Sequence, residues 1–235
     1  MTDSPHRPPT FRFPSPDESM AFTGERYVSG LVGEIQHEHY HRYLFALQFC
    51  NGKDVLDVAS GEGYGSCLLG QVARSVVGVD IDADSVAFAA RNHATATVSF
   101  RKGKAEALPL EAQSVDVVVS FETLEHFEDQ PAFVGEVLRV LRPGGMLVIS
   151  SPDRVTYSEK RDFKNAFHVR ELDRQELRDL LATRFAHIAL FEQRALWGSV
   201  ILGDEATGAR GVAGFISEDG TCFSSCAGVP EAPYL

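Results

Sequence analysis

The chain has 235 residues, of which 44% are hydrophobic and 23% charged, and its formal net charge is −11. These values are typical of a globular protein with one sizeable core and argue against disorder. The acidic balance disfavours a nucleic-acid interface, which needs a basic face, and no apolar run approaches the roughly 18 residues of a membrane span. A cytoplasmic location with reduced thiols is expected, because the four cysteines include no CxxC pair.

Prolines are concentrated at the start of the chain, so residues 1–20 are expected to form a flexible leader. A helix is predicted at 34–50 from the period of its apolar residues. Helix-like amphipathic stretches, such as 85–92 and 132–141, alternate with five short apolar runs, at 53–59, 75–81, 97–102, 115–121 and 146–151. Strands that are apolar almost throughout and alternate with helices predict a parallel sheet covered on both faces.

The pattern is less regular after residue 152, where a helix is predicted near 171–184 and strands at 187–193 and 196–201. We therefore predict an α/β fold with a doubly wound, mostly parallel sheet of seven strands. It forms a single domain over residues 21–201, with a substrate-side insertion at 152–170. Residues 202–235 are expected to be a glycine-rich tail.

The stretch VLDVASGEGYGS, residues 55–66, has glycine at three alternate positions where the first strand of the sheet turns into a helix. Ligands bind at this carboxyl edge in open α/β sheets. Ser66 interrupts the dinucleotide pattern G-x-G-x-x-G, and the phosphate-binding G-x-x-x-x-G-K-[S/T] is absent. Asp80 ends the next strand, where a carboxylate can accept hydrogen bonds from two ribose hydroxyls. A nucleoside-type ligand is therefore predicted, although several folds bind one.

Three motifs follow later in the chain: GKAEALPL (103–110), VDVVVSFETLEHF (115–127) and LRPGGMLVIS (141–150). Their order and spacing distinguish between the folds that bind a nucleoside. Together with the glycine turn and Asp80, they resemble class I S-adenosylmethionine-dependent methyltransferases, with a methyltransferase type 11-like domain. The resemblance covers about residues 53–151. A looser similarity, in GERYVSG…GEIQHEHYHRY and FHVREL, is to methyltransferases that modify sugars or glycan precursors.

The resemblance implies S-adenosylmethionine as the cofactor and assigns roles around it: backbone approach at the glycines, ribose binding, adenine packing and contact with the sulfonium. The residues expected to bind the cofactor are Tyr27, Arg42, Gly61, Glu62, Gly63, Asp80, Ile81, Ala105, Glu106, Ser120 and Phe121. Tyr27 or Arg42 is expected to meet its carboxylate. Lys104 stands where the family commonly has an acid, so Glu106 or a backbone carbonyl has to accept from the adenine amino group.

Transfer of an activated sulfonium methyl is an in-line displacement, so proximity and exclusion of water supply most of the acceleration. A hydroxyl acceptor also needs a base. His168, in the insertion, is the preferred candidate, and His126, at the exit of the fourth strand, is the alternative. Glu122, Glu125 and Asp153 leave strands at the same edge.

The expected function is methyl transfer to a small-molecule or saccharide acceptor, with O-methylation favoured. The basic residues of the insertion form either a solvated loop or an anion-binding cap for a phosphate-bearing or acidic acceptor. The alternatives are C- or N-methylation of a quinone- or polyketide-like molecule, and a non-catalytic module that binds S-adenosylmethionine. His37 and His41, with Glu34, have metal-ligand spacing on the predicted helix, but methyl transfer requires no metal and none is expected.

Overall fold

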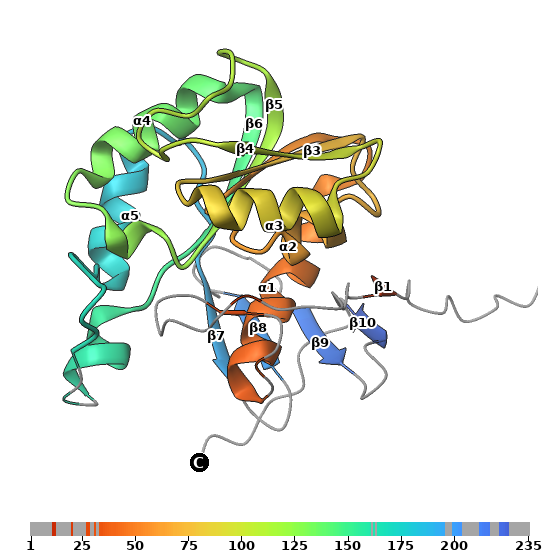
Figure 1. Ribbon diagram of the computed structural model, residues 1–235. Helices are drawn as coiled ribbons and strands as arrows, with labels where there is room; N and C mark the ends of the chain where they lie inside the picture. Colours follow the sequence, from red (N-terminus) through yellow and green to blue (C-terminus); the bar gives the residue numbers. More distant parts are fainter. Residues whose placement is uncertain are drawn as a thin grey trace, which may run out of the picture.

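The computed structural model describes residues 11–12, 20, 27–28, 31, 33–160, 162, 164–195, 199–203, 212–216 and 221–225. Five parallel strands form its central sheet in the order β4-β3-β2-β5-β6 (Figure 1). Their bounds are Asp54–Val58 (β2), Ser75–Asp80 (β3), Val98–Lys102 (β4), Val115–Phe121 (β5) and Leu141–Ser150 (β6). The first strand of this sheet, β2, lies at its centre. The strands β3 and β4 extend the sheet on one side of β2, and β5 and β6 then extend it on the other side. The predicted doubly wound parallel sheet is therefore confirmed.

Helices cover both faces of this sheet, as the apolar strands require. They are α1 (Glu34–Cys50), α2 (Tyr64–Leu69), α3 (Ala83–His93), α4 (Gln130–Val140) and α5 (Arg174–Ala182). Val55 packs with α1 and α2, whereas its neighbour Leu56 packs with α4 and α5 on the other face. Asp82, Asp129 and Asp173 cap α3, α4 and α5 by accepting backbone hydrogen bonds in their first turns. None of the described helices is long and apolar enough to cross a membrane.

The number of strands in the sheet differs from the prediction of seven. The last two predicted strands, β7 (Phe191–Ala195) and β8 (Ser199–Gly203), pair antiparallel in a second sheet, β1-β10-β9-β8-β7, beside α1 (Figure 1). This sheet joins β1 (Phe11–Arg12), from the expected leader, to β9 (Val212–Ile216) and β10 (Thr221–Ser225), from the expected tail. Apolar periodicity identifies a strand but not its partner, so the sequence could not separate the two sheets.

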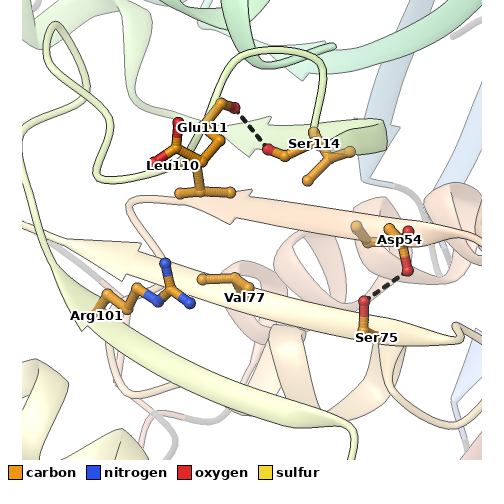
Figure 2. Close-up of a pocket in the computed structure, with 9 residues that line it drawn as sticks. Asp54, Ser75, Val77, Arg101, Leu110, Glu111 and Ser114 are labelled. Carbon is orange, nitrogen blue, oxygen red and sulfur yellow. Dashed lines mark hydrogen bonds between the residues drawn. The ribbon is translucent and has the colours of Figure 1, made fainter. Parts of the chain in front are cut away.

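A cavity of about 320 Å³ lies under the loop that joins β4 to β5 (Figure 2). Leu110 and Glu111 of this loop line it, together with residues that begin strands, including Asp54 and Ser75. It therefore lies toward the amino ends of the strands. The ligand edge predicted from the sequence is at their opposite, carboxyl ends.

Candidate functional site

The carboxyl ends of β2, β3 and β5 lie level with one another, because Val58 is paired with Val79 on one side and Ser120 on the other. Two non-glycine residues next to these strand ends have positive φ, 58° at Ala59 and 50° at Glu122. Such strain collects where a fold shapes a binding site. Both residues lie at the edge of the parallel sheet where the chain reverses its winding direction.

The three glycines of the turn are required for different reasons. Gly61 (φ 52°) and Gly63 (φ 85°) have left-handed backbones, and Gly63 precedes the first residue of α2. A Cβ on Gly65 would lie 2.0 Å from the ring of Tyr43, so this glycine serves the packing of α1 against α2. A Cβ on Gly61, by contrast, would have no atom within 4 Å. Only the first part of the turn is open for a ligand.

Asp80 connects the glycine turn to the start of α3. Its carboxylate accepts hydrogen bonds from the backbone N–H groups of Gly61, at 2.8 Å, and Asp82, at 2.9 Å. Asp82 caps α3, so Asp80 is not the cap of that helix. Ile81 beside it is 63% exposed, which leaves its face free to pack on a ligand.

Asp57 is wholly buried behind the turn. Its carboxyl accepts hydrogen bonds from Ser66 Oγ, at 2.6 Å, and from the hydroxyl of Tyr43, at 3.2 Å. Burial raises the pKa of Asp57 to about 7, although both hydrogen bonds oppose the rise. Asp57 therefore supports the turn through side chains of α1 and α2.

Two buried hydroxyls at this edge have no hydrogen-bond partner among the described residues: Ser60 Oγ, at the end of β2, and Ser120 Oγ, in β5. Buried polar atoms without partners are uncommon, and each calls for an explanation. Phe121, next to Ser120, packs edge-on against Tyr43 with ring centroids 5.0 Å apart. The loop after β4 brings half-buried Ala105 to the same edge, whereas Glu106 is exposed.

Three residues expected at the cofactor have partners within the protein. The hydroxyl of Tyr27 donates to Leu31 O, and its ring lies in a buried aromatic cluster. Glu62 is wholly buried and accepts from the backbone N–H of Met20 at 2.6 Å. Arg42 donates through Nε to the side chain of Gln193 and lies 3.6 Å from Glu122, but its buried Nη1 has no partner among the described residues.

The two candidate bases lie side by side, with ring centroids 5.3 Å apart. His126, at the end of the short helix η1 (Leu124–His126), hydrogen-bonds through Nδ1 to Phe167 O at 2.9 Å, so Nδ1 carries the proton. Nε2 of His126 therefore has its lone pair free. The structure brings the two histidines together although they are far apart in the sequence: Phe167, which precedes His168, is 41 residues from His126.

His168 has partners at both ring nitrogens. Nδ1 lies 2.6 Å from the carboxylate of Glu171, and Nε2 lies 3.0 Å from Nδ2 of Asn165. Asn165 accepts from Phe167 N through its oxygen, so its NH₂ group faces the ring. His168 therefore donates from Nδ1 to Glu171 and accepts at Nε2.

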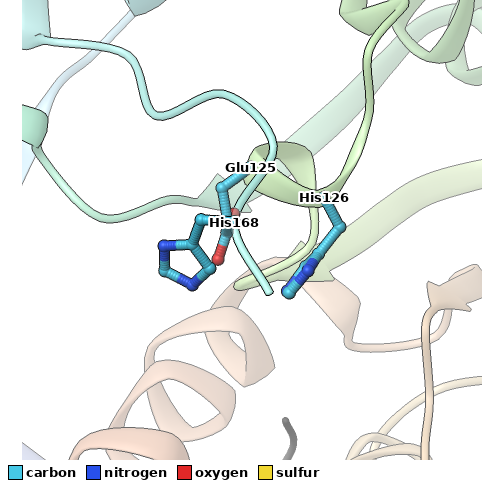
Figure 3. A group of neighbouring side chains, drawn as sticks. All are labelled: Glu125, His126 and His168. Carbon is cyan, nitrogen blue, oxygen red and sulfur yellow. The ribbon is translucent and has the colours of Figure 1, made fainter. Parts of the chain in front are cut away.

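Glu125 links the exit of β5 to the insertion. Its backbone oxygen accepts from the N–H groups of Val169 and Arg170, at 2.9 and 3.0 Å. Its carboxyl is buried, and burial, followed by the nearby charge of Glu122, raises the pKa of Glu125 to about 8. Figure 3 shows this carboxyl between the rings of His126 and His168.

One basic residue of the insertion, Arg154, is already paired with carboxylates of the protein. Arg154 precedes the π-helix η2 (Val155–Glu159) and is surrounded by the carboxylates of Glu159, Asp173 and Glu176. Arg161 lies outside the described residues. Asp153, a candidate base, accepts instead from Thr156 and from the backbone of Arg174.

Residues 56–149 match the family model described as "Methyltransferase domain". A "probable S-adenosylmethionine-dependent methyltransferase" of Mycolicibacterium smegmatis is 44% identical over 168 residues, 70% of this chain and 65% of the relative. A "phthiotriol/phenolphthiotriol dimycocerosates methyltransferase" of Mycobacterium leprae is 31% identical, over 59% of this chain and 52% of the relative. The YcgJ protein of Bacillus subtilis has the same fold, with a TM-score of 0.57 at 22% identity over 67% of this chain and 71% of that one.

The fold and these matches agree with the resemblance of the motifs to class I S-adenosylmethionine-dependent methyltransferases. Residues 56–149 carry the methyltransferase domain that the family model describes, and the cofactor that this domain and the named relatives imply is S-adenosylmethionine. The chain spans about two thirds of the first of these relatives and about half of the second.

Several residues of the site were not found from the sequence. In the sequence, Tyr43 is only one of the apolar positions of the helix predicted at 34–50, but in the structure it donates a hydrogen bond to Asp57 and packs against Phe121. Asn165 and Glu171 orient His168. Glu171 lies within the FHVREL motif, but the motif assigns it no role, and Asn165 lies outside that motif. The pairing of His168 with Glu171, three residues apart, is the one local signal that could have found them.

Proposed function

We propose that this protein transfers a methyl group from S-adenosylmethionine to an oxygen of a small acceptor with an apolar body. The proposal that S-adenosylmethionine is the methyl donor rests on one observation. The buried hydroxyls of Ser60 and Ser120 have no partner among the described residues, at the same edge as the open face of Gly61. A polar ligand at this edge would supply their missing partners. After its two backbone hydrogen bonds, the Asp80 carboxylate still has lone pairs for ribose hydroxyls. Ile81 offers an apolar face for adenine.

The remaining cofactor contacts follow from the same geometry. Gly61 leaves the backbone bare beside the methionine part, whereas the space next to Gly63 is filled by Ala89 and Phe100. Nη1 of Arg42 is the free donor proposed for the carboxylate of the cofactor. When bound, the cofactor supplies an activated methyl group. The protein then has to hold the acceptor in line with that group and exclude water, for which Phe121 and Tyr43 provide a packed apolar wall.

An apolar acceptor is proposed because the insertion presents Phe167, 42% exposed, and Val169, 56% exposed, next to the two histidines. The relative from M. leprae is named for phthiotriol and phenolphthiotriol dimycocerosates, which agrees with an apolar acceptor. Arg154 is neutralised by its neighbours, so a phosphate-bearing saccharide is the less favoured acceptor.

His126 and His168 are the proposed groups on the acceptor side. The geometry favours His126 for contact with the acceptor, because its Nε2 is free, whereas Nε2 of His168 already accepts from Asn165. This order is the reverse of the one expected from the sequence. If His126 takes the proton of a hydroxyl, His126→Ala lowers kcat by about 10²–10⁴-fold. His168→Ala then has the smaller effect.

The test is incubation with methyl-labelled S-adenosylmethionine and three groups of acceptors: long-chain hydroxy or carboxylic lipids, phenols and quinols, and nucleotide sugars. Mass spectrometry identifies the product and the methylated atom. We expect methylation of an apolar acceptor, with a KM that rises in Phe167→Ser while cofactor affinity is unchanged. Methylation of nucleotide sugars alone would contradict the apolar acceptor, and cofactor binding without any product would favour the non-catalytic module.

A further inference from the structure

Glu125, His126 and His168 come from two separate segments, and each presents one potential ligand atom within 4.8 Å of the others (Figure 3). Two imidazoles and one carboxylate are a common ligand set for divalent first-row metals. We propose that these three residues form a divalent metal site. Within the part of the chain that the structure describes, this is the one such group, and the spacing of His37 and His41 does not produce another.

The surroundings of the two histidines support this assignment independently of their distance. Histidines that bind a metal almost always donate their other ring N–H to a carbonyl or a carboxylate, which orients the ring. Nδ1 of His126 donates to the carbonyl of Phe167, and Nδ1 of His168 donates to the carboxylate of Glu171. In each ring Nδ1 therefore carries the proton, and the lone pair is on Nε2, which points away from the partner of Nδ1.

Glu171 is held in place for this role. Its side chain is only 9% exposed, and it accepts a further hydrogen bond from Ser158 Oγ. At Nε2 of His168, the present partner is the neutral amide of Asn165, in a loop. A metal ion would replace that single hydrogen bond, and the NH₂ group of Asn165 would keep a second partner, the hydroxyl of Tyr157 at 3.4 Å.

The role of the metal rests on the proposed function. Three protein ligands leave coordination positions open, and the site adjoins the exposed side chains of Phe167 and Val169. A hydroxyl or carboxylate oxygen of the acceptor is the ligand that fits these positions. In the metal-loaded protein, His126 then coordinates the ion and does not act as a base.

The metal site is tested by titrating Zn²⁺ into the full chain after removal of metals by chelation and dialysis, with calorimetry as the readout. We expect one Zn²⁺ per chain. His126→Ala and His168→Ala should each weaken binding at least about tenfold, and Glu171→Gln, which keeps the shape of the side chain, by about 10–100-fold. His37→Ala is the matched control, because it removes a histidine from α1 outside the group, and it should bind Zn²⁺ like the wild type.

Absence of stoichiometric Zn²⁺ binding, or an equal loss in His37→Ala, would overturn the metal site. Because Glu125 is wholly buried, Glu125→Gln endangers folding, and the half-buried His126 carries the test instead. S-adenosylmethionine binding is measured on the same metal-free protein. Cofactor binding without Zn²⁺ binding refutes the metal site alone, whereas Zn²⁺ binding without cofactor binding supports the metal site and refutes the proposed function.

Discussion

Asp57 makes a sharp prediction about the pH dependence of stability, because its carboxyl is wholly buried behind the glycine turn. Burial raises its pKa to about 7, compared with 3.8 for an ordinary aspartate. The folded protein therefore holds this proton more tightly than the unfolded chain does. Asp57 then lowers the free energy of unfolding as the pH rises from about 4 to about 7, and the loss persists above pH 7.

The magnitude follows from the two pKa values. Their difference corresponds to about 4 kcal/mol, which is the upper limit for the effect of this residue. Asp57→Asn removes the titration but keeps the shape, and the hydroxyls of Ser66 and Tyr43 can accept as well as donate. Relative to the wild type, the variant should gain almost nothing at pH 4 and as much as about 4 kcal/mol at pH 8.

Urea denaturation between pH 4 and pH 8.5, without cofactor, measures this difference. Asp54→Asn is the matched control of opposite sign, since Arg74, Ser75 and Arg142 hold the pKa of Asp54 below its ordinary value. Its contribution is present above the ordinary pKa and is lost on acidification, so Asp54→Asn should destabilise at pH 7 and less so in acid. Parallel pH profiles for the wild type and Asp57→Asn would refute the reasoning.

Further variants test the turn and its surroundings. Asp80→Ala should weaken S-adenosylmethionine binding by about 1.5–3 kcal/mol in calorimetry, the scale for losing charged hydrogen bonds, and unchanged affinity would remove Asp80 from the cofactor site. Gly65→Ala should destabilise by about 1–3 kcal/mol in thermal denaturation, because its Cβ meets the ring of Tyr43. Gly135→Ala, in α4 with open space around it, should stabilise by about 0.5–1 kcal/mol, and equal shifts in both variants would disprove the packing argument. Gln130→Leu should cost about 1–3 kcal/mol in urea denaturation, because buried Gln130 donates to two backbone carbonyls, and a neutral result would show that water replaces it.

Local pattern was sufficient for the parallel sheet and its ligand edge. β5 and α1 occur at the predicted residues, because β5 is an almost wholly apolar run and α1 has a helical period of apolar residues. The glycine turn and Asp80 were found for the same reason: they are adjacent to strand ends, and the direction of a strand decides which end faces the ligand.

Tertiary structure decided what depends on contacts between distant segments. The sequence placed β7 and β8 in the parallel sheet, but strand pairing is a choice of partner that periodicity does not encode. The same holds for Gly65, whose need for glycine comes from the ring of Tyr43 on another helix. It holds most of all for Glu125, His126 and His168. Their common site exists only because the insertion folds back onto the exit of β5, where backbone hydrogen bonds to Glu125 hold it.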